Sequence, residues 1–342
     1  MRVGLHLGYW GSGPPPDAER QVATVEDLGL DSVWTAEAYG SDALTPLAWW
    51  GSRTRRLRLG TAVVQMAART PTATAMAAMT MDHLSGGRFV LGLGVSGPQV
   101  VEGWYGSAYP RPLARTREYV DVVRQVLRRE EPVTSAGRFV QLPYPGGTGL
   151  GRPLRSTVRP LRADLPIHLA AQGPRNVALA AEIAEGWLPL LVAPRLDHTY
   201  RQWLADGFAR RDPRLPGQDR FEVAATVPVV VHDDVETAAD AVRPFIALYV
   251  GGMGARSANF HREAVERLGY EQAAARVADL YAAGRREEAA AAVPVELVDE
   301  VALVGPRERI AERVSTWRGT VVTTLLVQGD EVALRAVADG LG

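Results

Sequence analysis

The segment Gln172–Asn176 combines residue types and spacing that indicate an anion-binding site. It reads Gln-Gly-Pro-Arg-Asn and joins an apolar run, Ile167–Ala171, to an Ala- and Leu-rich helical pattern over Asn176–Ala184. Pro174 is suited to the first turn of that helix. Free backbone N–H groups and the positive end of the helix dipole attract anions at such a turn, and Arg175 adds a full positive charge. An ordinary strand–turn–helix connection has the same form, so both interpretations stay open at this point.

A second glycine-rich segment, Gly92-Leu-Gly-Val-Ser-Gly97, formally matches the dinucleotide-binding fingerprint. A Rossmann site needs a helix directly after the glycines and an acidic residue about 20 residues later. Here Pro98 and an aromatic loop containing Trp104 and Tyr105 follow, and no acidic residue ends a second strand at that spacing. We therefore interpret the segment as a strand end where a flat ring can approach the backbone.

Two residue types are missing from the 342 residues, and their absence narrows the possible chemistry. Without Cys there is no thiolate nucleophile, iron–sulfur cluster or Cys-ligated zinc. Without Lys, since all 38 basic residues are Arg, there is no P-loop lysine and no Schiff-base catalysis. The formal net charge of −1 gives no general attraction to nucleic acid or membranes. No signal-like or membrane-spanning segment is evident, so we expect a cytoplasmic protein.

The rest of the chain alternates between strand-like and helix-like patterns. Strands are predicted at Val3–Tyr9, Ser32–Ala36, Leu57–Val64, Phe89–Val95, Ile167–Ala171, Trp187–Leu191, Val223–Val231 and Val321–Val327. Helices are predicted at Ala18–Leu28, Leu44–Ser52, Thr72–Leu84, Arg115–Arg129, Asn176–Ala184, Arg195–Arg210, Arg307–Trp317 and Glu331–Leu341, with a longer helical tract from Val235 to Ala292. Eight apolar strands, each followed by helix, predict an α/β fold, the (β/α)8 TIM barrel.

We expect residues 1–342 to form a single (β/α)8 barrel domain with insertions at about 131–165 and 235–305. The first insertion is rich in Gly, Pro and Arg, and a short hairpin is predicted around Arg138–Leu142. The second is Ala-rich, charged and almost wholly helical.

Tyr9 lies at the carboxyl end of the first predicted strand, the end where barrel enzymes carry their chemistry. It is a candidate proton donor, and the alternative is an aromatic that packs at the rim. Tyr105 and Glu102 are comparable but weaker candidates. His6 is expected to be an interior histidine, and none of the histidines has the spacing of a metal site.

Five segments of the chain carry a resemblance to a known family: Ser32–Glu37, Leu59–Val63, Arg69–Pro71, Leu84–Gly94 and Ala171–Pro174. Together they resemble the bacterial luciferase-like superfamily, and within it the F420-dependent oxidoreductases. The resemblance covers essentially the whole chain, and it implies a barrel that binds coenzyme F420. It also implies hydride transfer between F420 and a small organic substrate containing a C=C, C=N or C=O/alcohol group. Dimers are common in this family, so a homodimer is expected.

The resemblance also implies a set of cofactor-binding residues. The Ala62–Val63 bond matches a non-prolyl cis peptide that supports the back of the deazaflavin ring, and Thr61 and Gln65, which flank it, should face the ring. Glu37 matches an acidic position near the polar edge of the ring and is, with Tyr9, a candidate catalytic residue. The remaining matches are Ser96 and Gly97, at the ring or ribityl chain, and Gln172, Gly173, Pro174, Arg175 and Asn176, at the phosphate.

The chain departs from the F420-dependent sugar-phosphate dehydrogenases at two positions. Ala38 replaces their catalytic histidine, and Val95–Pro98 contains no match to their loop glutamate. We therefore do not expect sugar-phosphate oxidation, and the family's catalytic residues cannot be transferred to this chain. An FMN-dependent luciferase-like monooxygenase, which shares the phosphate turn, is one alternative. A non-catalytic F420- or flavin-binding protein is another.

The cofactor's phosphate and polyglutamate tail suggest a role for the arginines of the first insertion. We hypothesise that Arg152, Arg155, Arg159 and Arg162 belong to a mobile basic lid over the active-site mouth. The alternative is a solvated loop whose charges have no such role.

Overall fold

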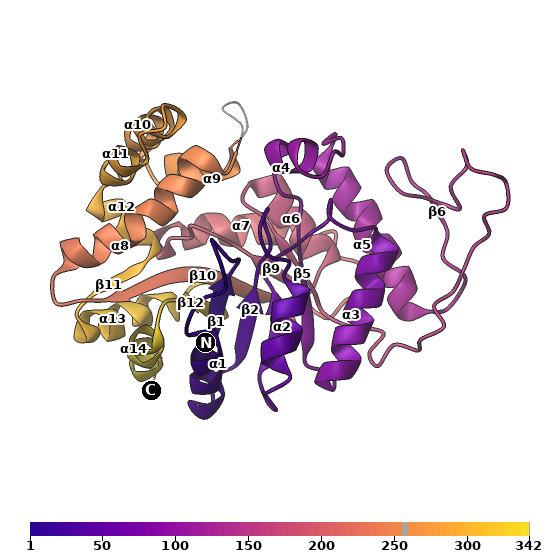
Figure 1. Ribbon diagram of the computed structural model, residues 1–342, viewed down its shortest axis with the longest axis horizontal. Coiled ribbons are helices and arrows are strands. Elements are labelled where there is room, and N and C mark those ends of the chain that lie inside the picture. Colours follow the sequence, from indigo (N-terminus) through magenta and orange to yellow (C-terminus); the bar gives the residue numbers. More distant parts are fainter. Residues whose placement is uncertain (255–258, 342) are drawn as a thin grey trace.

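The computed structural model describes residues 1–254 and 259–341 (Figure 1), and its parallel strands form a closed ring of eight. Each of the eight corresponds to a strand predicted from the sequence, which confirms the (β/α)8 barrel. In their order around the ring, the strands are β10 (Glu222–Val231), β12 (Thr324–Gln328), β1 (Arg2–Gly8), β2 (Ser32–Thr35), β3 (Arg58–Thr61), β5 (Phe89–Gly94), β8 (Ile167–Ala170) and β9 (Gly186–Leu188), which pairs again with β10.

Helices surround the ring because each has one apolar face. In α5 (Pro112–Arg128) the side chains of Tyr119, Val122, Val123 and Val126 are buried, a spacing that places them on one side of the helix. The other surrounding helices are α1 (Ala18–Asp27), α2 (Leu44–Gly51), α3 (Pro71–Ser85), α6 (Pro174–Ile183), α7 (Asp197–Phe208), α8 (Val235–Ala247), α13 (Arg307–Val314) and α14 (Glu331–Leu341). Short elements complete the connections: α4 (Pro98–Gly103) and the 3₁₀ turns η1 (Pro194–Leu196), η2 (Gln218–Arg220) and η4 (Ser315–Trp317).

Two strand predictions need correction. The expected strand Leu57–Val64 stops at Thr61, and the chain resumes as β4 (Val64–Gln65), which pairs with β5. The prediction also missed β11 (Leu303–Gly305), which pairs with the end of β10 outside the ring. At three residues, β11 is too short to show a strand pattern beside the helices that flank it.

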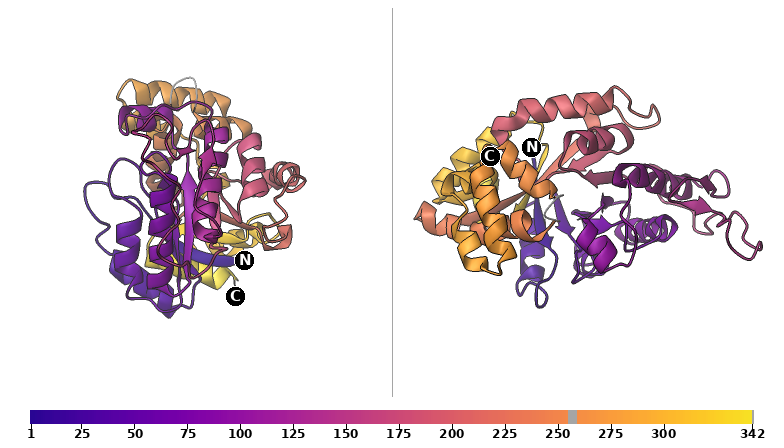
Figure 2. Two further views of the ribbon diagram at one scale, coloured as in Figure 1. Left: turned by 90° about the vertical axis from the view of Figure 1, so that its right-hand side faces the viewer. Right: turned by 90° about the horizontal axis from the view of Figure 1, so that it is seen from above.

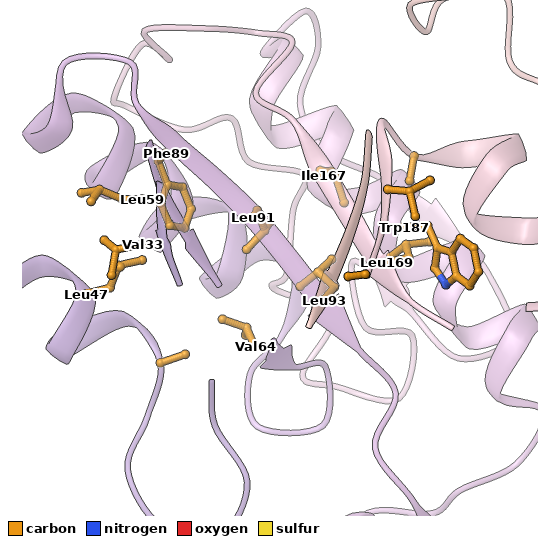
Figure 3. Close-up of a cluster of buried hydrophobic side chains, with 14 of the residues drawn as sticks. Val33, Leu47, Leu59, Val64, Phe89, Leu91, Leu93, Ile167, Leu169 and Trp187 are labelled. Atoms are coloured by element: carbon orange, nitrogen blue, oxygen red, sulfur yellow. The ribbon is translucent and has the colours of Figure 1, made fainter. Parts of the chain in front are cut away.

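Apolar side chains fill two layers, one inside the ring and one between the ring and its helices. Strand residues alternate between them: Val33 packs outward toward Leu47 and Leu59, whereas Trp34 packs inside the ring against Leu326. Figure 3 shows part of the outer layer, where side chains from α2 and from several strands meet.

A charged cluster lies at the amino ends of the strands, opposite the end where barrel enzymes work. Arg58 donates to Glu222 at 2.8 Å and to Asp31 at 2.6 Å. Thr324 donates to Glu222 at 2.6 Å. His168 lies beside this cluster, with its Nε2 3.6 Å from Glu222, and it stacks on Trp34 inside the ring. These contacts fix the register of strands that are far apart in sequence.

Residues 131–165 form an arm that projects from one side of the barrel (Figures 1 and 2). The predicted hairpin is present, with β6 (Ser135–Ala136) paired to β7 (Gln141–Leu142). The returning chain is tied to α3, where Arg162 Nε donates to Asp82 at 3.1 Å and His83 lies 2.8 Å from the Arg159 carbonyl oxygen. The hypothesis of a basic lid is therefore wrong, because the arm runs along the outside of the barrel and none of its described residues lines the cavity described below.

Residues 235–305 form a helical layer beside the carboxyl ends of the strands (Figure 1). After α8 the chain makes a π-helical turn, η3 (Leu248–Gly252). It then continues through α9 (Phe260–Arg267), α10 (Glu271–Ala282), α11 (Arg286–Ala291) and α12 (Val295–Val301). These elements share an apolar cluster of their own. No helix within the described ranges is long and apolar enough to cross a membrane.

Candidate cofactor and substrate site

A cavity of about 1370 Å³ lies at the carboxyl ends of the strands. Its wall contains Tyr9 and every predicted cofactor-binding residue except Thr61. The predicted residues on the wall are Tyr9, Glu37, Ala62, Val63, Gln65, Ser96, Gly97, Gln172, Gly173, Pro174, Arg175 and Asn176. These residues come from separate strands and loops, so the fold brings together residues that lie up to 167 positions apart in the sequence, from Tyr9 to Asn176.

The Ala62–Val63 peptide bond between β3 and β4 is cis, as the resemblance implied. Its neighbours hold this bulge through the backbone, since Ala62 N donates to Thr35 O at 2.7 Å and Glu37 N donates to Val63 O at 3.1 Å. The bulge interrupts the predicted strand and presents its peptide to the cavity.

The glycines of β5 make room for this bulge. A Cβ on Gly92 would lie 1.7 Å from the Thr61 carbonyl oxygen, and a Cβ on Gly94 would lie 2.5 Å from Val63 Cγ2. Our interpretation of Gly92–Gly97 as the place where a ring approaches the backbone is therefore corrected for Gly92, where the neighbouring chain takes the space, whereas Gly94, Ser96 and Gly97 line the cavity.

Thr61 is buried and turned toward β5. Its hydroxyl donates to Gly92 O and accepts from Gly92 N, both at 2.9 Å. Both hydrogen-bonding functions are thus engaged, and Thr61 does not line the cavity. Thr61 therefore links β3 to β5 through its side chain, whereas the sequence predicted that it would face the ring.

The Glu37 carboxylate is fully engaged by its surroundings. Arg69 Nη1 lies 2.8 and 3.0 Å from its two oxygens. The backbone N–H groups of Gln65 and Ala43 donate to it at 2.7 and 3.2 Å. With only 3% of its side chain exposed, Glu37 anchors the chain after the bulge to α2 and to Arg69. The geometry indicates a positioning role for this residue.

Gln65 lines the cavity, and its side chain has a buried acceptor without a partner among the described residues. Its side-chain Nε2 donates to Glu37 O at 3.1 Å and to Ala38 O at 2.8 Å, which fixes the orientation of the amide. Its Oε1 is buried and has no partner among the described residues. A buried acceptor of this kind needs a donor, and a ring N–H of a flavin or deazaflavin fits that need.

The N-terminus of α6 provides the anion site predicted from the sequence. Gly173 is the N-cap and supplies no side-chain cap, and Pro174 occupies the first turn. Arg175 is exposed beside it. Gln172 is turned away from this site, because its Nε2 donates to Leu190 O at 2.8 Å. The uncapped amides, the helix dipole and the Arg175 charge together fit a phosphate.

Sequence reasoning missed several polar residues of the cavity wall, among them Tyr249, His261, Thr226 and Gln328. Tyr249 lies on the π-helical turn η3, with its phenol close to that of Tyr9 on the cavity wall. No local motif marks these four positions. Only a π turn, which often accompanies functional sites, could have directed attention to Tyr249, and a π turn cannot be read from the sequence.

Burial changes the protonation of the cavity's aromatic and imidazole groups. It lowers the pKa of His6 and of His261 to about 4, so both are neutral at neutral pH. Burial also raises the pKa of Tyr9 and of Tyr249 above their ordinary value, which keeps both phenols protonated. His6, expected in the interior, lies on the cavity wall with its Nε2 3.4 Å from Ala62 O.

The other sequence candidates lie off the wall. Tyr105 donates to Ala38 O at 3.3 Å, and Glu102 is exposed, and neither lines the cavity. Across the described ranges, no group of three or more His, Asp or Glu side chains is arranged to hold a metal ion.

Comparisons with known proteins agree with this geometry. A Mycobacterium tuberculosis protein, named provisionally as a coenzyme F420-dependent oxidoreductase, is 56% identical over 96% of this chain and 94% of its own length. The solved F420-dependent tetrahydromethanopterin reductase from Methanopyrus kandleri superposes with a TM-score of 0.80 at 21% identity, covering 99% of this chain and 97% of that one. An F420-dependent secondary alcohol dehydrogenase, solved with an F420–acetone adduct, gives 0.76 at 16% identity, covering 99% and 96%. These two superpositions establish the shared fold.

The sequence pattern of the luciferase-like monooxygenases matches residues 2–324. This match runs from β1 to the first residue of β12, and it includes the bulge and the phosphate turn. The chain therefore belongs to the luciferase-like monooxygenase family.

Proposed function

We propose that this protein is an F420-dependent oxidoreductase that transfers a hydride between coenzyme F420 and a small organic substrate. The observation that carries the proposal is one cavity that joins an unpaired, buried Gln65 acceptor to an uncapped helix N-terminus. The first suits the polar edge of a deazaflavin ring and the second suits its phosphate. The 56% identical mycobacterial relative, whose name includes F420, supports the same cofactor.

The residues have separate tasks in this proposal. The Ala62–Val63 bulge supports one face of the ring, and the Oε1 of Gln65 accepts a ring N–H. Ser96 and Gly97 line the path toward the phosphate, and the amides that open α6 hold the phosphate with Arg175. When bound, the reduced cofactor supplies a hydride and the oxidised cofactor accepts one; the chain orients the reactants and shields them from water.

Parallel titrations with F420 and FMN test the cofactor. We expect F420 to bind more tightly than FMN, and the protein with reduced F420 to consume no oxygen. Arg175→Ala should weaken F420 binding about tenfold and leave the binding of the deazaflavin core without phosphate and tail unchanged. Arg152→Ala, on the arm, is the matched control and should not change F420 affinity. Tighter FMN binding with oxygen uptake would instead support the flavin monooxygenase alternative.

A panel of alcohols, ketones, imines and enones distinguishes an enzyme from a protein that only binds its cofactor. Turnover of any member with F420 supports the proposal, whereas tight F420 binding without turnover across the panel supports the non-catalytic alternative.

We further propose a single-domain chain with insertions at 131–165 and 235–305, acting in the cytoplasm as a homodimer, without nucleic-acid partners. Analytical ultracentrifugation tests the dimer, and limited proteolysis tests whether 235–305 separates from the barrel.

A further inference from the structure

The side of the cavity across from the bulge has a different chemical character. In the order of strands around the ring, β10 lies four positions from β3 in either direction, and so faces it. The wall there comes from the carboxyl ends of β9, β10, β12 and β1, together with η3 and α9. Its residues include Leu190, Thr226, Gln328, Tyr9, Tyr249 and Phe260.

This wall is almost free of charge. The charged residues that line the cavity, within the described ranges, are Glu37, Arg111, Arg175 and Glu263. The first three lie on the side assigned to the cofactor. Glu263, on α9, is half exposed at the rim and lies 3.8 Å from Arg267. Because His261 on this wall is neutral, a charged substrate group buried here would find no counter-ion among the residues that the structure describes.

Tyr9 and Tyr249 give this wall two neighbouring phenols. Burial raises the pKa of both, so both stay protonated at neutral pH, and a phenolic hydroxyl can donate a hydrogen bond to a ligand oxygen. Tyr249 is held by ring contacts, with its centroid 4.8 Å from that of Phe245 and 4.8 Å from that of His261. The pair is therefore a fixed hydrogen-bond donor on an uncharged wall.

We propose that this wall binds an uncharged, largely apolar carbonyl compound, and that Tyr9, backed by Tyr249, donates its hydroxyl proton to the carbonyl oxygen. This inference rests on the proposed function and names its substrate class. Gln328, whose buried Oε1 also lacks a partner among the described residues, adds an acceptor to the same wall.

The step balances with reduced F420 as the two-electron reductant. The hydride adds to the carbonyl carbon, the π electron pair moves to the oxygen, and that oxygen takes the Tyr9 proton. The transfer is downhill because an alkoxide is far more basic than a phenolate, even when burial has raised the pKa of the phenol. Reduced F420 gives up a proton as well as the hydride when it returns to the oxidised form, and this proton, carried by water and the neighbouring Tyr249, restores the Tyr9 hydroxyl once the product leaves. Alcohol oxidation runs through the same steps in reverse.

Isotope-edited infrared spectroscopy tests the hydrogen bond without turnover. The probe is 4-phenyl-2-butanone labelled with ¹³C at the carbonyl, added to protein loaded with oxidised F420, which cannot reduce it. We expect the carbonyl stretch to move to lower frequency on binding to wild type. Tyr9→Phe should abolish that movement, Tyr249→Phe should reduce it, and Tyr144→Phe, on the exposed arm, should leave it unchanged.

Affinities for the same probe complete the test. Tyr9→Phe should weaken ketone binding about threefold to tenfold, the range for one hydrogen bond. The anion 3-phenylpropanoate, of similar size, should bind at least about tenfold more weakly than the ketone. Failure of the ketone to bind wild type, equal binding of the anion, or the same carbonyl frequency in wild type and Tyr9→Phe would overturn the inference. F420 titration of the same samples distinguishes the two kinds of failure. Lost F420 binding contradicts the proposed function, whereas retained F420 binding means that only the inference about Tyr9 and Tyr249 has failed.

Discussion

Replacement of Glu37 by Gln separates a positioning role from a catalytic one. The amide keeps the shape of the carboxylate but removes its charge. Its N–H₂ group would also face one of the N–H donors of Arg69, Gln65 and Ala43 that point at the carboxylate in the wild type. Removing one partner of a buried ion pair costs about 3–5 kcal/mol. Arg69 is 24% exposed and retains Asp42 at 4.0 Å, so solvent and this second carboxylate compensate in part. We therefore expect Glu37→Gln to lower the free energy of unfolding by about 2 kcal/mol.

Urea denaturation followed by circular dichroism measures this loss. Glu19→Gln is the matched control: Glu19 pairs with Arg53 on the surface with 55% of its side chain exposed, and its loss should change the free energy of unfolding by less than about 0.5 kcal/mol. Because Glu37 supports the bulge, its replacement should also weaken F420 binding. The reasoning fails if Glu37→Gln unfolds at the wild-type urea concentration and binds F420 normally, yet loses turnover, because Glu37 would then act on the substrate directly.

Three other perturbations test other contacts of the structure. Burial lowers the pKa of His168 to about 4, so the unfolded chain binds this proton more readily, and the free energy of unfolding should fall by up to about 3 kcal/mol as the pH drops from about 6.5 to about 4. His168→Gln should weaken this pH dependence of the free energy of unfolding, measured by urea titration at several pH values, and an unchanged pH dependence would contradict the reasoning. Gly92→Ala should lower the free energy of unfolding by more than about 3 kcal/mol and abolish F420 binding, because its Cβ has no room beside the bulge, whereas Gly173→Ala, with nothing within 4 Å of its Cβ, should fold normally. Replacing Arg152 and Arg155 together by Ala should leave F420 affinity unchanged in fluorescence titrations, and a tenfold loss would restore the lid.

The barrel was predictable because its signals are local. Each strand is a short apolar run with a helical pattern after it, and α6 begins at a Gly-Pro pair that marks its start in the sequence. The phosphate turn needs only adjacent residues, so its geometry follows from its own segment. The bulge was predictable only through resemblance, since nothing in Ala62–Val63 itself indicates a cis bond.

The errors came from contacts between segments. Thr61 was expected at the ring because it flanks the bulge, but Gly92 offers both a donor and an acceptor to its hydroxyl. The arm was expected over the mouth of the active site because of its arginines. Instead, Arg162 forms an ion pair with the buried Asp82 on α3, and this ion pair holds the chain outside the barrel. In both cases a polar group took a partner that lies far along the chain.

The same reasoning explains why the two halves of the cavity differ in how far they can be predicted. The cofactor half is built by β2, β3, β5 and the start of α6, where each residue sits at the end of a strand. The substrate half depends on how η3 and α9 pack above β1 and β10, and Asn259 fixes that packing by donating to the carbonyl oxygens of Tyr249 and Val250 at 3.1 and 2.8 Å. Its own side chain also caps α9 through His261 N and Arg262 N. Substitutions in this layer can therefore reshape the substrate wall while the bulge and the phosphate turn keep their form, which lets one cofactor site serve different substrates.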